Sequence, residues 1–268
     1  MRFQASLETR IEKRMKTSTH QSKLRIAMIM AAGYGTRMGR LTQKLPKPLL
    51  PMNGFRIIEI ILHKLAHQGI ERAVINLHYL PHLVEDFLGD GKRYGLELIY
   101  SEEADILGSG GGIANAEQYF EDETILVVNA DTLNTLDIAT FYRYHCQTEA
   151  LATMHVLPSQ NNHDYTLVLF DGDNRLQRIL GRDKAIPPEL SSGIFTGYQI
   201  LSPQARAYLT PVNQSIITNL YLRGVEEGKM INVFPRETQW IDIGTANFYH
   251  TLVKRIQAGE FDLEVFKV

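Results

Sequence analysis

The stretch RIAMIMAAGYGTRMGR, residues 25–40, decides the fold of this chain of 268 residues. Its first eight residues are mostly apolar and predict a buried strand, and the glycines that follow predict a loop. Apolar residues at helical spacing then run from 57 to 66 and end at Gly69, before a second apolar run at 73–77. Strand, helix and strand in this order predict one βαβ unit.

The alternation of strand and helix continues along the chain, and after residue 150 it changes to β segments with fewer helices. This order predicts an α/β fold in one domain, residues 25–268, with a Rossmann-like, mixed and mainly parallel sheet flanked by helices. The further predicted helices are 81–88, 113–120, 137–145, 203–208 and 246–258, and the further strands are 96–100, 124–129, 152–157, 166–170, 176–180, 193–201, 231–234 and 239–241.

The composition excludes several classes of protein. Hydrophobic residues make up 44% of the chain and charged residues 22%, as in globular domains. A net charge of −2 gives no field that attracts nucleic acid, and no apolar run is long enough to span a membrane. We therefore expect neither nucleic acid nor a membrane as a partner. We expect the protein to be a monomer or a weak homo-oligomer.

The single cysteine and the N-terminal residues bear on location. Cys146 cannot form an internal disulfide, which favours a reducing compartment and predicts a cytoplasmic protein. Residues 1–24 are mostly polar and lack the apolar core of a secretory signal. We expect them to form a disordered arm.

The glycine loop after the first strand is the first candidate ligand site. It lies at the carboxyl edge of the predicted sheet, where α/β proteins bind ligands, and glycine N–H groups there can converge on phosphate oxygens. Arg37 adds planar donors suited to phosphate. The alternative is a plain turn between strand and helix. A dinucleotide fingerprint fails because Met38 stands where it needs glycine, and the Gly-Lys-Ser/Thr triplet of a P-loop is absent.

A lysine between prolines follows the loop, in LPKPLLP at residues 45–51. The flanking prolines fix an extended backbone and leave Lys47 little conformational freedom. A lysine held in this way is suited to bind an NTP phosphate. The alternative is a surface lysine in a rigid turn.

Two aspartates are candidates for one metal site. Asp131 follows the predicted strand 124–129, and Asp242 ends the strand at 239–241. Nucleotidyl transfer needs charge neutralisation, usually by Mg²⁺ on one or two carboxylates and the substrate phosphates. Either aspartate can instead be a turn or cap residue, although Thr245 is better placed than Asp242 to cap the helix that follows.

Residues 30–51, MAAGYGTRMGRLTQKLPKPLLP, resemble the signature of the sugar-1-phosphate nucleotidyltransferases, also called sugar-nucleotide pyrophosphorylases. The strings around Asp131 and Asp242 are similar to the family's Asn-Gly-Asp and Trp-x-Asp-x-Gly-Thr motifs, with Ala130 in place of glycine. Arg40 also departs, from a common proline. The resemblance implies transfer of a nucleoside monophosphate from an NTP to a sugar 1-phosphate, by a nucleotide-binding half (25–150) and a sugar-binding half (151–245).

The same resemblance implies roles for individual residues. Arg37, Lys47 and Asp131 would be catalytic, and Asp131 and Asp242 would hold Mg²⁺. The run LGSGGGI at 107–113 precedes a predicted helix and is similar to the turn that packs on the nucleobase, with Glu102 upstream in the base-reading region. His78 is a further possible contact, although a lone histidine at a strand end is more often structural. The implied nucleotide-binding residues are Ala31, Ala32, Gly33, Gly35, Thr36, Arg37, Lys47, Asn76, Gly111 and Gly112.

The acceptor site is implied less completely. FTGYQIL at 195–201 is similar to the family's Phe-Ser/Thr-Gly strand, which implies sugar contacts at Thr196 and Gly197, and Asp164 matches an acidic position of short bacterial members. The Glu-Lys-Pro triplet of longer members is absent. The short members that use UTP and N-acetylmuramic acid 1-phosphate, in cell wall recycling, are the most similar. Mannose-1-phosphate guanylyltransferases, cytidylyltransferases acting on an alcohol phosphate, and a silent nucleotide-binding regulator remain alternatives.

Overall fold

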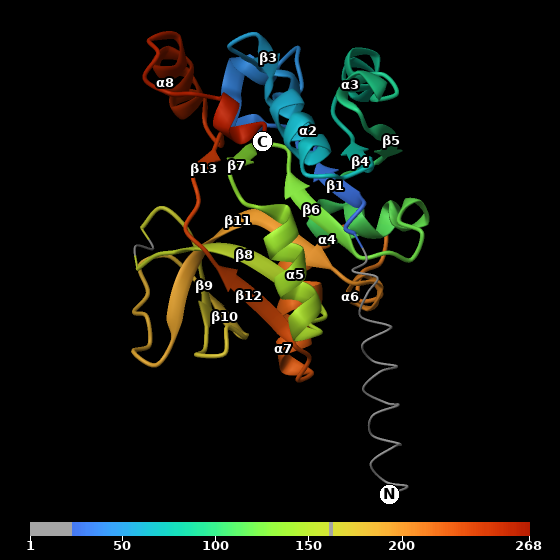
Figure 1. Ribbon diagram of the computed structural model, residues 1–268. Helices are drawn as coiled ribbons and strands as arrows, with labels where there is room; N and C mark the ends of the chain where they lie inside the picture. Colours follow the sequence, from blue (N-terminus) through green and yellow to red (C-terminus); the bar gives the residue numbers. More distant parts are fainter. Residues whose placement is uncertain (1–22, 161–162) are drawn as a thin grey trace, which may run out of the picture.

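The computed structural model describes residues 23–160 and 163–268. The predicted arm, residues 1–24, lies outside this part of the chain except for its last two residues. The strands of the main sheet run in the order β10-β9-β11-β6-β1-β4-β5; off this path, β8 pairs with β11, and β12 pairs with β8. Figure 1 shows the sheet running through the molecule, with β8–β12 in its lower part and α2 and α3 in the upper part of the view.

The first half of the sheet is parallel, as the sequence predicted. β1 (Ile26–Met30) lies between β6 (Ile125–Asn129) and β4 (Arg72–Leu77), and β4 pairs with β5 (Glu97–Glu102). β1, β4 and β6 are almost wholly buried because helices cover both faces, whereas β5 at the edge is partly exposed. Their carboxyl ends therefore lie along one edge of the sheet.

The second half of the sheet is mixed. β11 (Ser191–Leu201) runs antiparallel to β6 and thereby joins the two halves, and it also pairs with β8 (Ala152–Pro158) and β9 (Leu167–Phe170). β12 (Ile231–Pro235) returns parallel to β8, and β10 (Leu176–Leu180) closes the edge. The predicted α/β class with a mainly parallel central sheet is confirmed.

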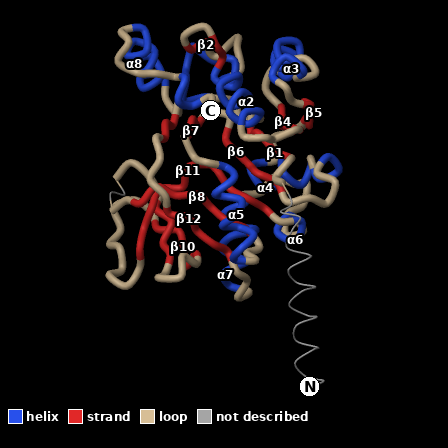
Figure 2. Tube along the Cα trace, in the orientation of Figure 1, coloured by secondary structure: helices blue, strands red, loops and turns tan. Residues whose placement is uncertain are grey.

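The helices lie on both faces of the sheet, and α5 covers β8 and β12 (Figure 2). No helix in the described ranges is long and apolar enough to cross a membrane. Short 3-10 turns at Thr36–Thr42 and Lys47–Leu49 follow β1. The helices are α2 (Ile57–His67), α3 (Pro81–Leu88), α4 (Gly108–Asn115), α5 (Ile138–Thr148), α6 (Pro203–Arg206), α7 (Arg223–Glu226) and α8 (Ala246–Gln257), with a π-helical turn at Ile217–Leu222.

One small ribbon decides the position of the site. β13 (Trp240–Asp242) leaves the second half and pairs antiparallel with β7 (Thr132–Asn134), directly after the end of β6. The pairing places Asp242 opposite Thr132, and the Ile243 N–H donates to the Asp131 carbonyl oxygen at 2.9 Å. Residues more than a hundred positions apart therefore meet at the carboxyl edge of β6.

The predicted helix at 113–120 is displaced in the structure. α4 begins at Gly108, so the glycine run forms the helix and does not precede it. The glycines are tolerated there because the segment 210–216 packs directly on their backbone: the Gly110 N–H donates to the Gln214 carbonyl, and the Gln214 N–H to the Leu107 carbonyl, both at 2.9 Å. Tertiary contacts outweigh the low helix propensity of glycine here.

Candidate functional site

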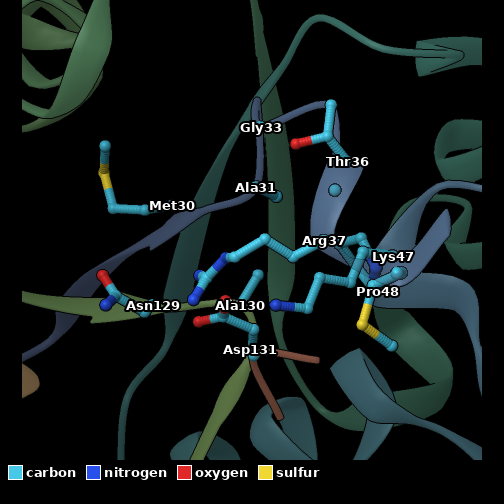
Figure 3. A pocket seen from close by; sticks show the side chains of 13 residues that line it. Met30, Ala31, Gly33, Thr36, Arg37, Lys47, Pro48, Asn129, Ala130 and Asp131 are labelled. Carbon is cyan, nitrogen blue, oxygen red and sulfur yellow. Dashed lines mark hydrogen bonds and ion pairs between the residues drawn. The ribbon is translucent and has the colours of Figure 1, made fainter. Parts of the chain in front are cut away.

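A cavity of about 260 Å³ opens at the carboxyl ends of β1 and β6. It brings together the predicted glycine loop, Lys47 and Asp131, and Figure 3 shows Arg37 and Lys47 both directed toward Asp131. The predicted site residues that are not among its walls are Ala32, Asn76, Gly111, Gly112, Asp242 and the three sugar contacts. The walls are Met30, Ala31, Gly33, Gly35, Thr36, Arg37, Met38, Lys47, Pro48, Asn129, Ala130, Asp131 and Gly244.

The two glycines of the loop have different roles. Gly35 has a φ of +64°, and a Cβ there would lie 3.1 Å from Thr42 Cγ2 and 3.2 Å from Lys47 Cβ, so this position needs glycine. The Thr42 hydroxyl fixes the turn by donating to the Gly35 carbonyl at 3.0 Å. At Gly33 nothing lies within 4 Å of the Cβ position, and the backbone faces open cavity.

Asn76 has a structural role that holds the loop, and its contact with a nucleotide stays a prediction. Its side chain is only 2% exposed; Oδ1 accepts from the Ala31 N–H at 2.7 Å and Nδ2 donates to Glu103 Oε1 at 2.7 Å. The Ala31 N–H is thus also occupied within the protein. The polar groups of Asn76 link the end of β1 to the segment after β5.

Glu103 is the residue that sequence reasoning missed. It is buried, and its second carboxylate oxygen accepts from the Leu107 N–H at 2.9 Å, while its neighbour Glu102 is exposed. Because adjacent residues at the end of a strand point to opposite sides, the sequence pattern identified the correct segment but not which of the two glutamates is buried. Glu103 follows the last residue of β5, and no regular alternation of burial along β5 distinguishes it from Glu102.

Lys47 is a buried cation in the cavity wall. The backbone agrees only in part with the predicted extended conformation: Pro46 is extended, but Lys47 begins a short 3-10 turn. The residue is 8% exposed, and its Nζ lies 2.5 Å from Asp131 Oδ2. The alternative of a surface lysine is therefore excluded.

Asp131 and Asp242 lie close enough to influence each other. Burial raises the pKa of Asp242, and the negative charge of Asp131 raises it further, while Lys47, Arg37 and a hydrogen bond from Tyr165 act in the opposite direction. Asp242 does not cap α8, because the Thr245 hydroxyl accepts from the Phe248 N–H. The carboxylate is thus available for another task.

The two carboxylates fit a divalent cation that binds mainly through its substrate. No cluster of three or more histidine, cysteine, aspartate or glutamate side chains occurs within residues 23–160 and 163–268. The repulsion that raises the pKa of Asp242 is the kind of strain that a shared cation removes. Mg²⁺ commonly takes one or two protein carboxylates and completes its shell with phosphate oxygens and water.

Gly111 and Gly112 are packed against protein on the side of their Cβ positions, and their contact with a nucleobase stays a prediction. A Cβ at Gly111 would lie 2.0 Å from the Val212 carbonyl oxygen. At Gly112 it would lie 2.6 Å from Glu103 Oε1 and 2.8 Å from Asn76 Nδ2. Both glycines are required by close packing at the buried side of α4.

The predicted sugar contacts also differ from expectation. Thr196 is 0% exposed and its hydroxyl bonds to His155 Nδ1 at 2.8 Å, so its side chain does not reach a ligand. Gly197 has a φ of +84°, and a Cβ there would lie 2.6 Å from Nδ2 of Asn129. Asp164 is exposed, next to Tyr165. Gly197 thus packs against Asn129, which lines the cavity, but Gly197 is not itself a wall residue.

The chain was compared with known families and proteins. The family described as nucleotidyl transferase matches residues 26–259. N-acetylmuramate alpha-1-phosphate uridylyltransferase of Neisseria meningitidis is 32% identical over 82% of this chain and 93% of its own length. Mannose-1-phosphate guanylyltransferase of Mycobacterium tuberculosis is 31% identical over 64% of this chain, and UTP–glucose-1-phosphate uridylyltransferase of Synechocystis is 28% identical over 87%.

Solved structures show the same fold. HddC from Yersinia pseudotuberculosis, crystallised with GMP-PN, superposes with a TM-score of 0.74 at 22% identity, covering 87% of this chain and 100% of that one. A UDP-glucose pyrophosphorylase bound to UDP-glucose gives 0.71 at 17% identity, covering 88% of this chain and 99% of that one.

These matches place the chain in a family. It belongs to the nucleotidyl transferase family, since the match covers nearly all of the described domain. The chain spans 64% and 47% of the lengths of the Synechocystis and Mycobacterium relatives, which are longer proteins.

Proposed function

We propose that this chain is a sugar-1-phosphate nucleotidyltransferase, which transfers a nucleoside monophosphate from an NTP to a sugar 1-phosphate and releases pyrophosphate. The observation that carries the proposal is the cavity at the ends of β1 and β6. It combines a glycine loop, two cations and a carboxylate, with Asp242 delivered by β13. This set of charged groups and backbone donors suits phosphoryl chemistry.

The reaction needs no covalent intermediate and no general base. An ionised oxygen of the sugar phosphate attacks the α-phosphorus in line and forms the new P–O bond. The bond between the α-phosphorus and its bridging oxygen breaks, and pyrophosphate leaves with the electron pair. Catalysis then consists of positioning and of stabilising negative charge.

Each group of the cavity has a defined task in this mechanism. The backbone of residues 33–36 binds the triphosphate, and Arg37 binds the leaving pyrophosphate. Lys47 stabilises charge on the α-phosphate, since its buried Nζ is held at Asp131 on the cavity wall. Mg²⁺ on Asp131 and Asp242 would neutralise charge on the phosphate oxygens.

Among substrates, we propose UTP and N-acetylmuramic acid 1-phosphate. The 32% identity with the Neisseria relative over 93% of that protein supports this pair. The 31% identity with the Mycobacterium relative supports GTP and mannose 1-phosphate as the second candidate. The single cysteine is consistent with a cytoplasmic enzyme of cell wall recycling.

The test is a substrate matrix. Each of ATP, CTP, GTP and UTP is combined with the 1-phosphates of N-acetylmuramic acid, mannose, glucose and a heptose, and with choline phosphate, and pyrophosphate release is measured with Mg²⁺. We expect the highest kcat/KM for UTP with N-acetylmuramic acid 1-phosphate. Turnover only with CTP and choline phosphate would indicate an alcohol-phosphate cytidylyltransferase. NTP binding without any turnover would indicate a regulator.

A further inference from the structure

An aromatic group stands beside the cavity and has no part in the mechanism above. Tyr34, between the two glycines of the loop, is 50% exposed, which is unusual for a ring of this size. Its hydroxyl nevertheless bonds to Nε2 of His78 at 3.0 Å. The ring also makes edge contacts with His78, at 5.2 Å between centroids, and with Tyr79, at 5.9 Å.

The group is fixed at several points. His78 Nδ1 lies 2.8 Å from the Glu103 carbonyl oxygen, which can only accept, so Nδ1 carries the proton. Nε2, on the other side of the ring, shares a hydrogen bond with the Tyr34 hydroxyl. The Tyr79 hydroxyl donates to the Gln43 carbonyl at 3.0 Å. The exposed ring is thus held in place before any ligand arrives, which lowers the entropic cost of binding.

The position of this group follows the strand order. In the proposed reaction the triphosphate lies over the ends of β1 and β6, and the acceptor half begins at β11, beyond β6. The nucleoside must then extend to the other side, over the ends of β4 and β5. Tyr34 and His78 stand there, between the glycine loop, the end of β4 and the segment after β5.

We infer that Tyr34 and His78 form one wall of the nucleobase subsite, with the Tyr34 ring packed against the base of the bound NTP. This inference rests on the proposed function. A ring held by a hydrogen bond to a fixed imidazole presents its face without preference among bases, since every base has a π-face. Tyr34 therefore contributes affinity for the nucleoside, and the choice of base is left to other groups.

The test separates the base from the phosphates. Binding of UTP, of GTP and of inorganic tripolyphosphate, which lacks a nucleoside, is measured by titration calorimetry for the wild type, Tyr34→Ala and Tyr34→Phe. We expect Tyr34→Ala to weaken the binding of each NTP that the wild type binds about 10-fold, the order expected for one base stacked on an aromatic ring. Tripolyphosphate binding should not change, and Tyr34→Phe, which keeps the ring, should stay within about 3-fold of the wild type.

Tyr208 provides a matched control on another part of the surface. Its hydroxyl also bonds to a side chain, Glu227 Oε2, at 2.7 Å, although its ring is half-buried. Tyr208→Ala therefore removes a hydrogen-bonded tyrosine outside the site and should leave the affinities for the NTPs and for tripolyphosphate unchanged. Equal NTP affinity in Tyr34→Ala and the wild type would overturn the inference, and so would an equal loss for tripolyphosphate. A wild-type protein that binds no NTP would overturn the proposed function as well.

Discussion

Polar side chains face a cavity in the first half of the sheet, whereas in the second half they are buried in the core. In the first half, Arg37, Lys47 and Asp131 project into one cavity at the strand ends. In the second half, Thr196 and His155 bond to each other inside the core. The first half therefore carries the reactive groups, and the second half mainly supports them.

Strand direction explains the difference. Parallel strands joined by crossovers all end at the same edge, so side chains that follow them converge whatever lies between them in the sequence. Antiparallel strands alternate in direction, and the position of a residue then depends on pairing with distant segments. The one carboxylate that the late part of the chain supplies, Asp242, reaches the site only because β13 returns to β7.

Substitution of the two aspartates gives the largest expected effect on turnover. The changes in stability of the two variants also compare the halves, because Asp131 follows a strand of the first half and Asp242 comes from the late part of the chain. Asp131→Asn and Asp242→Asn should each lower kcat by about 1,000-fold, because each removes charge that stabilises the transition state. Asp131→Asn should also destabilise the fold, since it leaves the buried Lys47 without its partner. Asp242→Asn should instead stabilise it by roughly 0.5–1 kcal/mol, because burial and repulsion already disfavour the charged form.

Pyrophosphate release and urea unfolding of both variants provide the measurements. The informative result would be that Asp131→Asn lowers the free energy of unfolding and Asp242→Asn raises it, while both variants lose turnover equally. An Asp242→Asn variant that is less stable than the wild type would show that the carboxylate is held by favourable contacts. An ordinary rate in either variant would remove that residue from the mechanism.

The next-largest expected effect is the pH dependence of stability, which arises from two buried histidines whose contacts stabilise the second half. Burial lowers the pKa of both His145 and His155 to about 4. Below about pH 6.5 the unfolded chain takes up protons that the folded protein refuses, so stability falls as the pH drops from about 6.5 to 4. Between pH 7 and 5 each histidine should account for a loss of about 2 kcal/mol.

Histidine variants distinguish this loss of stability from the loss that protonation of carboxylates causes. The free energy of unfolding is measured at pH 7 and pH 5 for the wild type, His145→Gln and His155→Gln. Each variant should be less stable at pH 7 and should lose less stability on acidification. If both variants lose as much as the wild type, the histidines are not neutral in the folded protein.

The sequence predicted the first half of the site more completely than the second. The glycine loop, Lys47 and Asp131 each follow a strand or a rigid proline turn, and local patterns fix such positions. Thr196 lies in a strand whose inward face is set by pairing with β8, which no local pattern reveals. The packing of the segment 210–216 on α4 depends on contacts about a hundred residues apart, and so the role of Gly111 was not predictable.

A pair of glycine variants compares the halves directly. Gly197→Ala should cost about 2 kcal/mol, since φ is +84° and the new Cβ would lie 2.6 Å from Nδ2 of Asn129. Gly33→Ala should change stability by less than about 0.5 kcal/mol, because nothing lies within 4 Å of its Cβ position. Its methyl group would instead occupy the cavity and raise KM for the NTP about 10-fold.

Urea unfolding and initial rates at varied NTP concentration measure both effects. A Gly197→Ala variant as stable as the wild type would mean that Asn129 moves aside at little cost, and the second half would then be less rigid than its packing indicates. A Gly33→Ala variant with unchanged KM would place the triphosphate away from that part of the loop.

The smallest expected effect concerns two threonines, one in each half. Thr196→Val removes the hydroxyl that bonds to His155 and should cost about 1 kcal/mol of stability, with KM for both substrates unchanged. Thr36→Val alters a side chain that lines the cavity and should do the reverse, raising KM for the NTP while stability stays within about 0.5 kcal/mol. If Thr196→Val instead raised KM for the sugar phosphate at unchanged stability, the hydroxyl would face the acceptor during turnover. The second half would then bind substrate directly as well as support the first.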